Sequence, residues 1–326
     1  MHKASLLRDV IVGIIVVIAA VLLNMAIGTP MLRDLALRLC SLGLFAVSLN
    51  LLVGYTGLLS FGQATFYGAG AYMFTLLMQK SGLGIPSAFG LTLIGVSLLA
   101  VVVGTICVRL TGVYFTFLTL AIQMMFYSML IAWSSFTGGE QGLTGGLPKP
   151  PFLGIDLTNP THFYIFSVSV FVVSLVILRR IVASPFGASL RMIRDNADRA
   201  LFLGVPVQRY KLFAFVVSSL FATVAGILTS LFVSGAFPNF AYWLTSGDGL
   251  FMIMLGGASN FFGPVLGAIV LIVLDNLINV HIKHHGLVLG VVILFVVLGM
   301  RKGILDYLAE IFASYSERSA TRRSQP

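Results

Sequence analysis

The chain has 326 residues, of which 58% are hydrophobic and 10% are charged, and its formal net charge is +9. A mean hydropathy of +1.01 lies outside the range of soluble domains, so the composition excludes an ordinary soluble protein. The positive charge does not indicate nucleic acid either, because the basic residues lie between apolar stretches. We predict a single membrane domain over residues 1–326.

Seven stretches are long and apolar enough to cross a bilayer, for which a helix needs about 20 residues. They cover residues 10–27, 35–53, 86–108, 113–133, 162–182, 211–235 and 286–300. The first exceeds the usual length of a signal-peptide core, so we expect a retained helix. The predicted fold is all-α and polytopic, with about 8–10 transmembrane helices including broken or re-entrant segments.

Glycine and proline interrupt two further apolar segments, 55–79 and 247–280, where they favour short, discontinuous helices. The interrupting residues are Gly54, Gly57, Gly62, Gly68 and Gly70 in the first, and Gly256, Gly257, Gly263, Pro264 and Gly267 in the second. A Phe-Gly pair followed by Gly-Ala recurs in both segments, which is a weak sign of an internal repeat. Interrupted segments at corresponding places in two halves indicate a transport pathway.

The distribution of Lys and Arg predicts the orientation. If the N-terminus is cytoplasmic and 247–280 enters and returns on the outer side, fifteen of these residues lie inside and five outside. This asymmetry follows the positive-inside rule and makes both chain ends cytoplasmic. The longest inner loop is then 183–210 and the longest outer loop 134–161, and the polar tail 316–326 is expected to fray.

Loop 183–210 carries the signals of two short helices. Ser184 before Pro185 is typical of a helix start, and Asn196 can cap a second helix with Asp198 in its first turn. Gly204 is then a natural stop. Such a pair could be gripped by a soluble partner, or it could be an ordinary basic loop anchored at lipid headgroups.

Five stretches carry a resemblance to one family, and their shared order strengthens it. They are SLNLLVGYTGLLSFGQATFYGAGAY (48–72), GVYFTFLTLA (112–121), TGGEQGLTGG (137–146), SPFGASLRMIRDNADRALFLGVPVQRYKLFAF (184–215) and LGGASNFFGPVLGA (255–268). Over nearly its whole length the chain resembles the permease of branched-chain amino acid ABC importers. The resemblance implies a bacterial inner-membrane protein that works with a second homologous permease, two cytoplasmic ATPase subunits and an external substrate-binding protein. Sister systems carry urea, short amides or aromatic acids, so the substrate stays open among these.

The resemblance also implies a coupling site. In such importers a short cytoplasmic helix of the permease docks in a cleft of an ATPase subunit, and its pattern is E-A-A with a Gly four positions on. Asp198, Arg199 and Ala200 stand in that place here, and Gly204 matches the Gly. Arg199 departs from the pattern. With the Asn196 cap, these residues form the predicted coupling site.

The broken segments supply candidates for the translocation pathway. Backbone groups freed from helical pairing are costly in hydrocarbon unless protein or water satisfies them, and half-helix N-termini suit a passing carboxylate. The candidates are Asn50, Ser60, Gly62, Gln63, Gly257, Ser259 and Asn260. The alternative, compatible with the first, is that Ala64/Gly68 and Gly263/Gly267 are packing seams of small residues.

Other polar residues have weaker functional interpretations. Asp275 could couple transport to protons, or it could be a helix-end residue near the outer surface, and Asp248 is interpreted as a helix start. The cluster from His281 to His285 is interpreted as surface histidines. The Gly-rich loop 137–146 is expected to pack over the pore mouth or to meet a partner.

Cys40 and Cys107 form no CxxC pair and are expected to be small buried residues, so no disulfide or metal site is predicted.

We compare three classes of function with the sequence. An ABC permease needs separate ATPases, because the chain has no G-x4-G-K-[S/T] run. A secondary transporter would bind coupling ions in broken helices, but carboxylates within spans are scarce. An intramembrane protease would need HExxH, which is absent, or two facing Asp residues. We expect the permease, with no catalytic residue or cofactor of its own.

Overall fold

The computed structural model describes residues 29–148 and 157–281, together with Val17, Gly290, Val291, Leu294, Gly303 and Ile304. Every regular element in this part of the chain is a helix, which confirms the predicted all-α class. The predicted spans 10–27 and 286–300 lie almost wholly outside the described residues, and the tail 316–326 lies wholly outside them.

Five of the described helices are long and apolar enough to cross a membrane. They are α2 (Pro30–Thr56), α4 (Ile85–Cys107), α5 (Val113–Ala132), α7 (Pro160–Ala183) and α10 (Val207–Val233). Each lies on a predicted span and ends within a few residues of the predicted boundaries. The chain is therefore a polytopic, all-α membrane protein.

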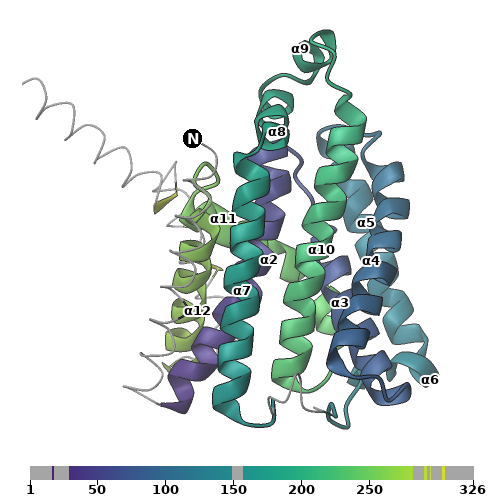
Figure 1. The fold of residues 1–326 in the computed structure, drawn as a ribbon, viewed down its shortest axis with the longest axis vertical. Helices are drawn as coiled ribbons and strands as arrows, with labels where there is room; N and C mark the ends of the chain where they lie inside the picture. Colours follow the sequence, from purple (N-terminus) through teal and green to yellow (C-terminus); the bar gives the residue numbers. More distant parts are fainter. Residues whose placement is uncertain are drawn as a thin grey trace, which may run out of the picture.

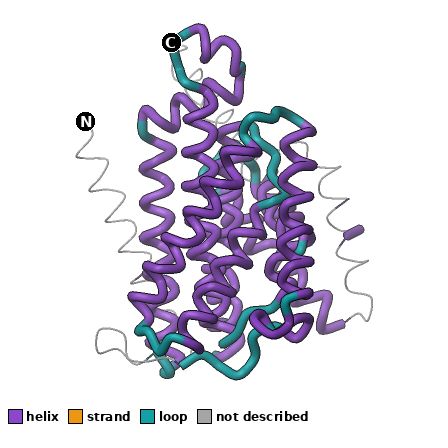
Figure 2. The backbone as a smooth tube through the Cα atoms, turned by 90° about the vertical axis from the view of Figure 1, so that its right-hand side faces the viewer, coloured by secondary structure: helices purple, strands orange, loops and turns teal. Residues whose placement is uncertain are grey.

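The long helices run side by side in one bundle (Figures 1 and 2). α2 and α10 form its centre, since 72% of the most apolar window of each is buried, whereas only 22% is buried in α4 and in α5. The outer faces of α4 and α5 therefore meet lipid or another protein. The short helices α8 (Pro185–Asp195) and α9 (Ala197–Phe202) project from one end of the bundle, and α6 (Ser134–Thr137) lies at the other (Figure 1).

The first glycine-rich segment is broken once, at residues 57–62, between α2 and α3 (Gln63–Lys80). Gly68 and Gly70 were expected to interrupt it further, but both lie within α3. A Cβ at Gly68 would lie 2.6 Å from the Cβ of Ala241, and one at Gly70 would lie 2.8 Å from the carbonyl oxygen of Thr223. Their small size permits close packing of helices, as the packing-seam alternative predicts.

The second segment is likewise broken once, at residues 257–262, between α11 (Trp243–Gly256) and α12 (Gly263–His281). Added Cβ atoms would collide with the carbonyl oxygen of Gly263 at Gly256 and with that of Met252 at Gly267. The glycines thus hold α11 and α12 at close approach, which confirms that Gly263 and Gly267 belong to a packing seam. The short 3₁₀ turns η1 (Gly139–Gln141) and η2 (Pro238–Ala241) complete the described elements.

Candidate functional site

The helical hairpin of α8 and α9 forms as its capping residues dictate. The Ser184 hydroxyl accepts a hydrogen bond from the backbone N–H of Gly187 at the start of α8, and the Asn196 side chain accepts one of 2.8 Å from that of Arg199 at the start of α9. Gly204 has φ +84°, the left-handed conformation that ends a helix. The caps and the stop are as predicted.

The tip of the hairpin is apolar and exposed. Leu201, Phe202 and Leu203 are 59%, 90% and 66% exposed, and Figure 1 shows α9 beyond the end of the bundle. Ala200, by contrast, is fully buried, while Asp198 and Arg199 are exposed. Leu201, Phe202 and Leu203 are not among the predicted site residues, although they form an apolar triplet between the Asn196 cap and the Gly204 stop.

The hairpin is attached to the first helix break through Arg194, near the end of α8. Its guanidinium donates a hydrogen bond of 2.6 Å to the backbone carbonyl oxygen of Gly54, in the last turn of α2. The same side chain donates to the Asp195 carboxylate at 3.1 and 3.2 Å, which fixes its direction. Gly57, with φ +74°, ends α2 directly against Arg194, where a Cβ would lie 2.9 Å from the Arg194 Cγ.

The second helix break reaches the same place. The Asn50 side-chain amide donates a hydrogen bond of 3.3 Å to the carbonyl oxygen of Ala258, and a Cβ at Gly54 would lie 2.5 Å from that oxygen. Arg179, near the end of α7, lies over the Phe262 ring with its guanidinium carbon 5.3 Å from the ring centroid. Both breaks therefore lie at the end of the bundle that carries the hairpin.

A buried polar cluster surrounds the start of α3. The Gln63 amide donates to the Ser218 hydroxyl at 2.8 Å, and Ser218 donates to the carbonyl oxygen of Ser48. The Ala64 N–H donates to the Ser246 hydroxyl, which in turn donates to Gln123, both at 2.9 Å. Ser60 accepts from the Gly62 N–H at 3.2 Å. The cluster joins α2, α3, α5, α10 and α11 and satisfies backbone groups that the bilayer would leave unpaired.

The predicted pathway residues thus divide into two groups. Ser60, Gly62 and Gln63 are buried in the polar cluster, whereas Asn50 contacts the second break. Within that break Gly257 is buried, Asn260 is half-buried and Ser259 is exposed. Sequence reasoning missed Ser218, Ser246 and Gln123, because a single polar residue in an apolar helix does not indicate its distant partner. Transport by any of these residues stays a prediction.

Asp248 and Asp275 lie at other places in their helices than the sequence predicts. Asp248 was interpreted as a helix start, but α11 begins at Trp243 and places Asp248 in its interior. Asp275 lies within α12, several residues before its last described residue, so it is not a helix-end residue in this structure.

Cys40 and Cys107 are free and buried, as expected. The side chains from His281 to His285 lie outside the described residues.

The Gly-rich loop 137–146 packs onto the segment that follows α10. Leu143 and Ala236 exchange two backbone hydrogen bonds of 2.7 and 3.2 Å. This pairing lies at the end of the bundle opposite the hairpin, where α10 ends (Figure 1). The loop therefore packs against this segment of the protein, while its expected position over the pore mouth or against a partner stays a prediction.

These features define a class: a multi-pass membrane transport component with interrupted helices and a projecting helical hairpin. The chain belongs to the family of permease components of branched-chain amino acid transport systems, whose family model matches residues 31–297. It is 26% identical over 80% of its length to the high-affinity branched-chain amino acid transport system permease protein LivM of Salmonella typhimurium, covering 67% of that protein. It is 27% identical over 85% of its length to LivM of Escherichia coli K12, covering 70%.

A probable LivM of Methanocaldococcus jannaschii is 24% identical over 76% of this chain and 81% of its own length. No solved structure matches the chain. Family membership and the apolar helices confirm the predicted transport permease of an ABC importer.

Proposed function

We propose that this chain forms the translocation pathway for branched-chain or related amino acids in an ATP-driven importer. It would work with a second homologous permease, two cytoplasmic ATPase subunits and an external substrate-binding protein. The names of its relatives support the substrate class, and the lack of a G-x4-G-K-[S/T] run supports ATP hydrolysis by separate subunits. The protein lies in the bacterial inner membrane, with both termini and the α8–α9 hairpin in the cytoplasm.

The exposed tip of α9 is the observation that carries the coupling proposal. Three neighbouring apolar side chains, including a Phe that is 90% exposed, are costly to leave in water at the end of a projecting hairpin. A groove on a soluble subunit would cover them and recover that free energy. We infer that Leu201, Phe202 and Leu203 insert into the ATPase subunit, while Asp198 and Arg199 contact its rim.

Movement of the hairpin would reach both helix breaks directly. α8 is bonded to the last turn of α2 through Arg194 and Gly54, and the preceding turn of α2 is bonded to the second break through Asn50 and Ala258. A shift of α8 driven by the ATPase would therefore displace residues 57–62 and 257–262 together. These two segments interrupt the regular helices, so they can change conformation with little loss of helical hydrogen bonding.

Two backbone donors at the start of α3 are hydrogen-bonded within the protein. Its Ala64 N–H is already bonded to Ser246, and its Thr65 N–H to the carbonyl oxygen of Gly62. A carboxylate could use the Ala64 N–H only after Ser246 moved away. We propose that α11 carries Ser246 away from α3 when the pathway opens, which would expose Gln63 and the N-terminus of α3 to the passing amino acid.

Uptake into proteoliposomes that contain the assembled transporter tests the proposal. Labelled leucine, isoleucine or valine should accumulate only with ATP and the binding protein present, and urea, short amides or aromatic acids should not compete. Competition by one of those compounds would assign the chain to a sister system. Uptake driven by an ion gradient without ATP would favour the second candidate, a secondary transporter in which carboxylates such as Asp248 and Asp275 bind the coupling ion.

A further inference from the structure

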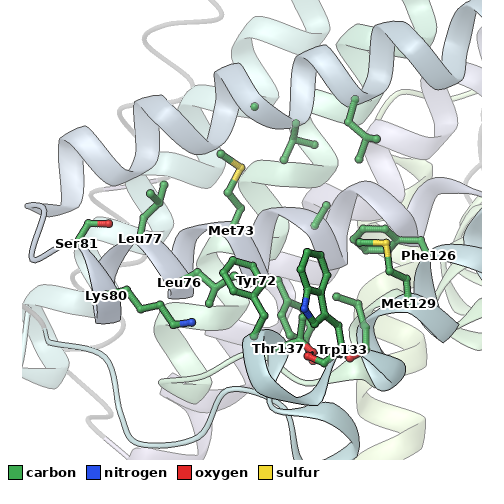
Figure 3. A pocket seen from close by; sticks show the side chains of 16 residues that line it. Tyr72, Met73, Leu76, Leu77, Lys80, Ser81, Phe126, Met129, Trp133 and Thr137 are labelled. Atoms are coloured by element: carbon green, nitrogen blue, oxygen red, sulfur yellow. Dashed lines mark hydrogen bonds between the residues drawn. The ribbon is translucent and has the colours of Figure 1, made fainter.

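A cavity of about 450 Å³ lies between α3, α4 and α5 at the end of the bundle opposite the hairpin. Its walls are aliphatic and aromatic side chains, among them Met73, Leu76, Leu99 and Phe126. Figure 3 shows Met73, Leu76 and Phe126 among the side chains that line it. Nothing in the coupling hairpin or the polar cluster uses this space.

Several side chains that line the cavity are exposed at the surface of the bundle. Met129, Trp133 and Phe136, which line it, are 47%, 52% and 42% exposed. Met129 belongs to α5, Phe136 to α6, and Trp133 lies between these helices; α5 is one of the two least buried long helices among the described ones. An apolar molecule could therefore enter from the membrane without crossing water.

One end of the cavity is polar and cationic. Lys80 and Ser81 end α3 at its rim, and the Lys80 ammonium lies 4.3 Å from the centroid of the Phe136 ring. Trp133 and Lys80 are the residue types that mark the membrane–water interface. Deeper inside, Tyr72 lines the cavity and is only 3% exposed.

We propose that this cavity binds an anionic phospholipid. One acyl chain lies among Met73, Leu99 and Phe126, and the Lys80 ammonium binds the phosphate at the rim. The positive charge of Lys80 matches the lipid phosphate, and the apolar walls match the acyl chain. A substrate amino acid fits less well, because no carboxylate among the described residues lining the cavity could bind its ammonium group.

Tryptophan quenching tests the proposal, since the chain has only two tryptophans. In a Trp243→Phe background, Trp133 at the cavity is the one reporter. The full chain is reconstituted in phosphatidylcholine vesicles that contain an equal, small fraction of either brominated phosphatidylglycerol or brominated phosphatidylcholine. Quenching by brominated phosphatidylcholine measures the contact of Trp133 with the bulk bilayer. We expect the Trp133 site to prefer phosphatidylglycerol about five-fold, as one lysine near the lipid phosphate predicts.

Matched variants separate the possible occupants. Lys80→Gln should abolish the preference and Lys80→Arg should keep it. Leu99→Phe, which fills the cavity, should reduce quenching by phosphatidylglycerol to the bulk level, whereas Leu98→Phe on the exposed face of α4 should not. Equal quenching by the two lipids in the unsubstituted cavity would overturn the proposal, as would displacement of brominated phosphatidylglycerol by added leucine. A preference that survives Lys80→Gln would also contradict it.

Discussion

The Arg194 guanidinium donates a hydrogen bond of 2.6 Å to the Gly54 carbonyl oxygen, so the hairpin is in direct contact with the last turn of α2, just before the first helix break. The two residues are 140 positions apart in the sequence. Gly54 also packs against Ala258 of the second break. One residue of α2 therefore connects the projecting hairpin with both interruptions of the transmembrane helices.

Replacing Arg194 by Met should weaken coupling. A hydrogen bond from a charged donor contributes about 1.5–3 kcal/mol, so its loss should lower ATP-dependent uptake by about ten-fold or more while ATP hydrolysis continues. Arg209→Met, at an exposed position at the start of α10, removes the same charge and should have little effect. Equal uptake by the two variants in proteoliposomes would show that the Arg194 contact does not transmit movement.

Gly54→Ala should destabilise the junction of the two breaks. The new Cβ would lie 2.5 Å from the Ala258 carbonyl oxygen and would also collide with the Asn50 side chain. Overpacking of this kind costs about 1–3 kcal/mol. Thermal unfolding in detergent should therefore occur at a lower temperature. The control is Gly90→Ala in α4, where a Cβ meets nothing within 4 Å, and this variant should be neutral or slightly stabilising.

Ser246→Ala should lower the stability of the protein, because Ser246 of α11 is bonded to the start of α3. The Ala64 N–H and the Gln123 side chain would both lose a buried hydrogen bond, at a cost of about 1–3 kcal/mol. Thermal stability should fall by a corresponding amount. Ser97→Ala removes a hydroxyl that bonds within its own helix at an exposed site and should leave stability unchanged. Similar stability of the two variants would contradict the proposed role of the cluster.

The local features of this protein were predictable, and its long-range contacts were not. Ser184, Asn196 and Gly204 cap or end helices through bonds to residues a few positions away, so the sequence around each contains the signal. The Arg194–Gly54 and Asn50–Ala258 contacts depend on how whole helices pack, which no local pattern encodes. Gly68 shows the same limit, because glycine can break a helix or admit a close neighbour, and only the position of Ala241 decides between them.

Gly204→Val should uncouple the transporter without preventing membrane insertion. Gly204 has φ +84°, where a β-branched residue is strained by about 1–3 kcal/mol, although a Cβ there has no neighbour within 4 Å. The strain should redirect the chain after α9, and uptake into vesicles should be lost. Gly204→Asn is the control, since Asn tolerates the left-handed conformation and should retain most of the activity. Normal uptake with Gly204→Val would indicate that the hairpin is a surface anchor and does not couple the permease to the ATPase subunits.

Co-purification of the ATPase subunits with Phe202→Ser tests the coupling account most directly. Phe202 is 90% exposed at the tip of α9, so its replacement should not disturb the fold of the permease. Met192→Ser, at an exposed position on α8 away from the tip, is the matched control. We predict that the ATPase subunits co-purify with the control and are lost from Phe202→Ser, together with ATP-dependent uptake. Normal recovery of the ATPase subunits and normal uptake with Phe202→Ser would contradict the account.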